Sequence, residues 1–125
     1  MLKLIRILAS VALVGCMLCQ LSCKQARETP VDASRPLEQS FQAEPETKQA
    51  IATVKASLQG GNYAQAARAI EPVLTGRKLT APQREAVGLL FQQISQAVAA
   101  NPGLDSKELY ELRVKLSRAA RGERF

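Results

Sequence analysis

The chain has no histidine and no tryptophan, and its aromatic residues are three phenylalanines and two tyrosines. Histidine is the commonest general base and metal ligand, so its absence removes the usual form of both sites. All three cysteines lie within residues 16–23, which leaves no thiol for catalysis or zinc binding in the rest of the chain. No Gly-Lys-Ser/Thr sequence is present to hold a phosphate group. We expect a non-catalytic protein with no cofactor, no metal ion and no small-molecule substrate.

Two acidic pairs remain as candidates for carboxylate chemistry: Glu44 with Glu46, and Glu108 with Glu111. Each pair lies near the start of an expected helix, where negative charge stabilises the helix dipole. We interpret both pairs as structural and keep a carboxylate-dependent cell-wall hydrolase as an alternative function. The absence of sugar-stacking aromatic residues beside these carboxylates weighs against that alternative.

The first 23 residues have the composition of an export signal. A basic head over residues 1–6 is followed by an apolar run over 7–14 and a small residue, Gly15. This order is typical of a secretory signal that is removed from the mature protein. Because basic flanks stay on the cytoplasmic side, we expect the rest of the chain to be exported.

The residues Leu13-Val14-Gly15-Cys16 resemble the lipobox of bacterial lipoprotein signals. The resemblance implies that lipid is attached to Cys16 and that cleavage just before it creates the mature N-terminus. Cys23 is the alternative lipid-bearing cysteine. An uncleaved membrane anchor over residues 4–23 is a further alternative, because about 20 apolar residues span a bilayer.

The same resemblance gives an expected membrane. The residue after the lipidated cysteine is Met17, or Lys24 for the alternative, and neither is the aspartate that favours retention in the inner membrane. We therefore expect anchoring on the periplasmic or outer side, with the outer membrane favoured in a Gram-negative organism.

The chain is moderately basic, with 17 basic and 11 acidic side chains and a net charge of +6. Removing Lys3 and Arg6 with the signal leaves 15 basic against 11 acidic side chains, a net charge of +4. Such a charge suits anionic lipid headgroups or acidic wall polymers. Nucleic acid is not an expected partner, because an exported protein rarely meets it and aromatic residues are few.

The pattern of the sequence divides the chain into four parts. They are a signal peptide, a lipid anchor with a flexible linker, a helical domain and a C-terminal tail, over residues 1–15, 16–43, 44–121 and 122–125. The linker shows no clear period, and Pro30 and Pro36 interrupt it. Leu37 and Phe41 are the linker residues suited to docking on the domain.

Two amphipathic helices are expected in the first half of the domain. The first begins near Glu44-Pro45 and ends at Gly60-Gly61, since glycine adopts the left-handed stop conformation without penalty. Asn62 caps the second, and Gly76 ends it.

Two more helices are expected in the second half, with no alternating strand pattern anywhere. The third begins with a capping box at Thr80 and Gln83. The fourth is capped by Asp105, with Glu108 three residues later. The expected fold is all-α, with four antiparallel helices.

The segment 61–66, Gly-Asn-Tyr-Ala-Gln-Ala, resembles the turn between the two helices of a tetratricopeptide repeat. The signature occurs once, and Ala50 and Val54 replace the large aromatic and glycine of the family's first helix. The resemblance implies a helical hairpin, in which the glycine makes the turn, the aromatic residue packs back on the first helix and the alanine three residues later lies at the close helix crossing. Together with the export signal, this hairpin leads us to expect a membrane-tethered adaptor that binds another envelope protein. The chain is also similar in size, anchor and helix content to pilotins, which escort outer-membrane secretin subunits.

One surface of the fourth helix is a candidate partner site. Tyr110 and Val114 lie opposite the leucine face of this helix, and Lys107, Arg118 and Arg121 surround them. Aromatic residues and arginine are favoured at interface centres. A second packing face within the domain, or ordinary surface exposure, is the alternative.

Overall fold

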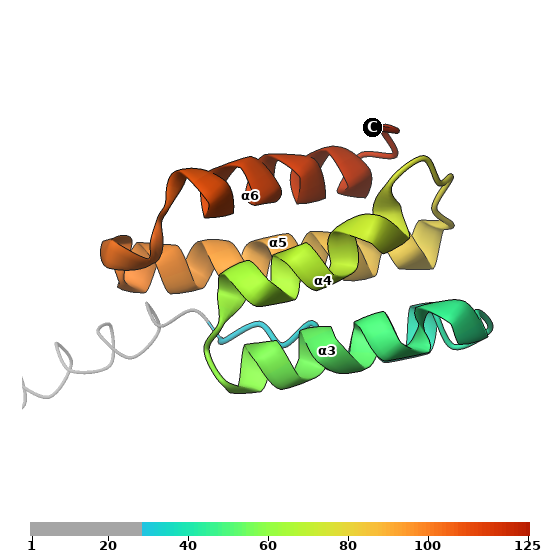
Figure 1. Ribbon diagram of the computed structural model, residues 1–125, viewed down its shortest axis with the longest axis horizontal. Coiled ribbons are helices and arrows are strands. Elements are labelled where there is room, and N and C mark those ends of the chain that lie inside the picture. Colours follow the sequence, from blue (N-terminus) through green and yellow to red (C-terminus); the bar gives the residue numbers. More distant parts are fainter. Residues whose placement is uncertain (1–28) are drawn as a thin grey trace, which may run out of the picture.

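The computed structural model describes residues 29–125, and these residues form an all-α domain (Figure 1). Within this range there are five α-helices and no strand. The helices are α2 (Ser34–Ser40), α3 (Lys48–Gln59), α4 (Tyr63–Leu74), α5 (Ala81–Ala100) and α6 (Lys107–Ala120). Two short 3-10 helices, η1 (Pro45–Thr47) and η2 (Pro102–Leu104), precede α3 and follow α5.

The helices form two antiparallel hairpins that α2 joins together (Figure 1). The hairpin α3–α4 lies against the hairpin α5–α6 through a contact between α4 and α6. On the other side α2 contacts both α3 and α5. The contacts therefore close a ring of five helices around one apolar core.

The segment expected to be a linker belongs to this core from Ala33 onward. Ala33, Leu37 and Phe41 are 0%, 0% and 3% exposed. Pro36 is the third residue of α2, where the backbone N–H has no intrahelical partner, so proline is tolerated there. The expected boundary at residue 44 is therefore wrong, and the domain includes α2. Because α2 is an additional helix, the domain has five α-helices where four were expected.

Side chains of α5 hold this segment in place. Gln93 Oε1 accepts a hydrogen bond from the Ala33 backbone N–H at 2.9 Å, and Gln96 Oε1 accepts one from Val31 N–H at 3.2 Å. At the other end of α2, Gln83 Nε2 donates to the Ser40 carbonyl at 3.3 Å. Gln93 and Gln83 thus satisfy backbone groups that a short helix leaves free, and Gln96 holds the chain just before α2.

Most expected helix ends are confirmed. The Asn62 side chain accepts from Gln65 N–H, and Gly61 before it has φ +72°. The capping box of Thr80 and Gln83 is present at the start of α5.

The expected cap of the last helix is wrong by one residue. Ser106 caps α6, because its hydroxyl accepts from Leu109 N–H at 3.0 Å. Asp105 instead accepts a hydrogen bond from Arg113 at 2.9 Å. At the C-terminal end Phe125 packs against the core, and its carbonyl accepts from Gly76 N–H at 3.0 Å.

In the range 29–125 no helix has both the length and the hydropathy needed to cross a bilayer. The expected signal peptide, Cys16 and its alternative Cys23 lie outside the described residues.

Candidate functional site

A groove between α5 and α6 contains the most exposed large apolar side chains of the described domain. It has a volume of about 350 Å³ and is lined by Phe91, Tyr110, Arg113, Val114, Ser117 and Arg121. Tyr110 is 58% exposed and Val114 43%, and no other large apolar side chain in residues 29–125 is classed as exposed. These two residues are four apart, so they lie one above the other on the helix surface.

The leucine pattern of α6 explains why this pair faces outward. Leu109, Leu112 and Leu116 are buried and fix the orientation of the helix. The opposite face must then be exposed, as the sequence indicates for Tyr110 and Val114. The pair is not a packing face for α2, which contacts α3 and α5.

Phe91 completes the groove from α5. It is only partly buried and also lines a second, larger groove of about 660 Å³ beside the start of the described chain. That groove includes Tyr63 and Val31. Phe91 thus lies between two surface depressions, and apolar surface continues across α5.

The cations predicted to surround the pair are only partly at the groove. Arg121 lines it, whereas Lys107 and Arg118 do not. Glu123 accepts from Arg121 Nε at 3.0 Å and from Arg118 Nε at 2.9 Å. The hydrogen bonds from Arg121 and then Arg118 hold the pKa of Glu123 below its ordinary value. Arg121 Nη1 also donates to Ser117 Oγ at 2.6 Å, which fixes its guanidinium at the groove edge.

Arg113 is one of three groove residues, with Phe91 and Ser117, that were not predicted from the sequence. Its guanidinium carbon lies 6.0 Å from the Tyr110 ring centroid, within the range of a cation–π contact. Its Nη2 donates to Asp105, while its Nε is buried without a hydrogen-bond partner. The spacing of Tyr110 and Arg113, three residues apart on one helix, is the sequence signal for this contact.

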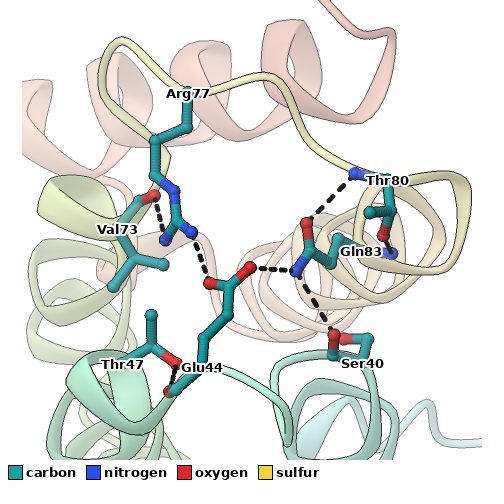
Figure 2. Close-up of polar contacts among 7 residues, drawn as sticks. All are labelled: Ser40, Glu44, Thr47, Val73, Arg77, Thr80 and Gln83. Carbon is teal, nitrogen blue, oxygen red and sulfur yellow. Dashed lines mark hydrogen bonds and ion pairs between the residues drawn. The ribbon is translucent and has the colours of Figure 1, made fainter.

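A polar cluster lies at the start of α5, around Glu44 (Figure 2). Glu44 forms an ion pair with Arg77 and accepts from Gln83 Nε2 at 3.0 Å. Arg77 also donates to the Val73 carbonyl, and Thr47 Oγ1 donates to the Glu44 carbonyl at 2.8 Å. These contacts join η1, the α4–α5 loop and the start of α5.

The environment of Glu44 favours its charged form. The hydrogen bond from Gln83 is the largest effect and Arg77 adds to it, so the pKa of Glu44 lies below its ordinary value. Glu44 is therefore charged and connects neighbouring segments of the fold. A general acid would instead need a raised pKa.

The other three candidate carboxylates show no shared site. Glu46 and Glu111 are exposed, and Glu108 pairs with Arg68 at 2.8 Å on the domain surface. Within residues 29–125 no three acidic or other ligand side chains are grouped closely enough to hold a metal ion. These contacts favour structural roles for the acidic pairs.

Comparison of the chain with protein-family models, curated proteins and solved structures finds no match.

Proposed function

We propose that this protein is a membrane-tethered, non-catalytic adaptor of the bacterial envelope, which binds another envelope protein through the α5–α6 groove. One observation carries the proposal: the two most exposed large apolar side chains of the described domain, Tyr110 and Val114, adjoin each other in one groove. An aromatic residue flanked by arginines is the composition found at interface centres.

The groove is large enough to form the centre of an interface but too small to form a whole interface. A stable interface contains roughly 20–30 residues on each partner, whereas six residues line this groove. The larger depression lined by Tyr63 and Phe91 adjoins it and extends the available apolar surface. We infer that a partner segment lies across α5 and contacts both depressions.

The architecture that we propose for this adaptor is similar to a tetratricopeptide hairpin followed by a second hairpin. In α3–α4 the turn at Gly61 is left-handed, Tyr63 packs partly against the core, and Ala66 is fully buried where the helices approach. These are the features that the resemblance implies. The α3–α6 helices then form the four antiparallel elements, and α2 covers the side between α3 and α5.

We also propose that lipid on Cys16, or on Cys23 as the alternative, holds the domain at a membrane. The mass of the intact protein extracted with detergent tests this assignment. A chain that begins at Cys16 and carries diacylglycerol supports it. A chain that still begins at Met1, or membrane association that survives when both cysteines are changed to serine, contradicts it.

In-cell crosslinking tests the partner surface. A photo-reactive amino acid replaces Tyr110 in one variant and the exposed Gln49 of α3 in a matched control. We expect the Tyr110 probe to capture one defined envelope protein and the Gln49 probe to capture none. Capture of a secretin subunit would assign the pilotin role. Capture only from Gln49 would place the binding surface elsewhere.

A further inference from the structure

The positive charge of the described domain is concentrated in two short segments. Residues 77–84 and 118–125 contain six basic side chains and one acidic side chain, a net charge of +5. The remaining described residues contain seven basic and nine acidic side chains, a net charge of −2. The six basic residues are Arg77, Lys78, Arg84, Arg118, Arg121 and Arg124.

The fold brings these two segments together, and we call the surface they form the cationic end. The Phe125 carbonyl accepts from Gly76 N–H, directly before the first segment. A Cβ added at Gly122 would lie 3.4 Å from Arg84 Cδ, so the Arg84 side chain lies along the C-terminal turn. Figure 1 shows the C-terminus and the α4–α5 loop at the same end of the molecule.

Half of these cations have no partner within the described chain. Arg77 pairs with Glu44, and Arg118 and Arg121 share Glu123. The other three, Lys78, Arg84 and Arg124, form no ion pair with any residue in 29–125. The cationic end therefore retains charge that is free to bind an anion.

The cationic end lies far from the point where the described chain begins. Val31 is bound to Gln96, which lies twelve residues beyond Arg84 on α5, or about 18 Å along the helix. Under the proposed anchor, the tether enters the domain near Val31, so the cationic end is the part of the domain more distant from the attachment. The preference for a polymer over a lipid surface as the ligand of the cationic end rests on that proposed anchor.

The surface chemistry of the cationic end favours binding by charge alone. Its exposed neighbours are small or polar, including Thr75, Gly76 and Thr80. The exposed large apolar side chains of the described domain, Tyr110 and Val114, lie in the α5–α6 groove, which meets the cationic end at Arg121. A folded protein partner generally needs such apolar anchors at the centre of its interface, whereas a polyanion does not.

We propose that the cationic end binds a polyanionic polymer that carries phosphate groups. Five of the six basic residues are arginine, whose guanidinium group matches phosphate oxygens with two parallel hydrogen bonds. Successive phosphates along one chain contact Lys78, Arg84 and Arg124 and displace condensed counterions.

Binding of long-chain polyphosphate to the purified full chain in a nonionic detergent tests the proposal. One triple variant changes Lys78, Arg84 and Arg124 to glutamine. The matched control changes Arg35, Arg68 and Lys107 to glutamine, which removes the same charge and the same residue types from other surfaces. Thermal melts of both variants check that the fold is intact.

We expect the end variant to bind polyphosphate at least tenfold more weakly than the unmodified protein at 50 mM salt, and the control less than threefold more weakly. The slope of log affinity against log salt should fall by about 2 in the end variant, at about 0.7 for each phosphate that the protein no longer neutralises. Equal losses in both variants, or no binding by the unmodified protein, would overturn the proposal. Tighter binding to polyglutamate than to polyphosphate would overturn the phosphate assignment. Tighter binding to mixed micelles of the same detergent with phosphatidylglycerol, lost in the end variant, would overturn the polymer assignment. None of these results depends on the α5–α6 groove.

Discussion

Replacing Leu37 with alanine tests whether α2 is part of the folded domain. Leu37 is fully buried in the core, on the helix that lies between α3 and α5. The change removes three carbon atoms from a site enclosed by two longer helices. Because those helices are held by their own hairpin partners, the cavity cannot close completely.

The expected loss of stability follows from this enclosure. Leucine-to-alanine changes in cores cost about 2–5 kcal/mol, and a domain of this size is stable by about 5–15 kcal/mol. A loss of about 3 kcal/mol, divided by an m-value of about 1.5 kcal/mol per molar urea, lowers the midpoint of unfolding by about 2 M.

Urea denaturation followed by far-ultraviolet circular dichroism measures this shift. The control is Val114→Ala, where a 43% exposed side chain should cost less than about 0.5 kcal/mol. The m-value should stay constant, because α2 unfolds together with the other helices. If the urea midpoint of Leu37→Ala equals that of the control, α2 is not part of the core and the segment is a linker.

Three further predictions concern local contacts. The pKa of Glu44 is lowered by Gln83 and Arg77. The contribution of Glu44 to stability is therefore complete above the ordinary glutamate pKa near 4.3, and it is lost as the pH falls through the lowered pKa. The urea midpoint of Glu44→Gln should lie below that of the unmodified protein at pH 7 and approach it at pH 3. Gly61→Ala should cost about 1–2 kcal/mol because φ is +72°, whereas Gly60→Ala, at φ −82°, should be neutral or stabilising; thermal melts that show equal losses would contradict the turn. Ser106→Ala should cost about 1 kcal/mol, and thermal melts that show no loss for Ser106→Ala would contradict the serine cap of α6.

Helix ends were predictable from the sequence because their chemistry is local. Asn62 and the Thr80–Gln83 box act on backbone groups within three residues, so the cap is contained in a short segment. The end of α6 was ambiguous because two residues that favour caps, Asp105 and Ser106, are adjacent. The choice depends on Arg113, eight residues beyond Asp105, which binds the aspartate and leaves the serine as cap.

The fifth helix was not predictable because its stability comes from elsewhere. α2 has seven residues, a proline in its first turn and one buried residue, Leu37, within its bounds. Isolated helices of this length are not stable in water. The glutamines of α5 that fix its backbone lie 60 and 65 residues away in the chain, and no local pattern indicates such contacts.

The candidate partner surface was predictable only in part. The leucine spacing of α6 shows that Tyr110 and Val114 face outward. Phe91 and Arg113 join them through the packing of α5 on α6, and the register between two helices is not contained in either one. Arg118 was included by its position on the helix but is bound to Glu123.

The most direct test of the adaptor proposal is the size of the complex that the protein forms in its own membrane. The solubilised envelope is separated by native gel electrophoresis, and the protein is compared with a Tyr110→Ala, Val114→Ala double variant whose melting temperature is unchanged. The account predicts that the unmodified protein migrates in an assembly larger than the single chain and that the double variant migrates alone. Migration of both at the same size would contradict it.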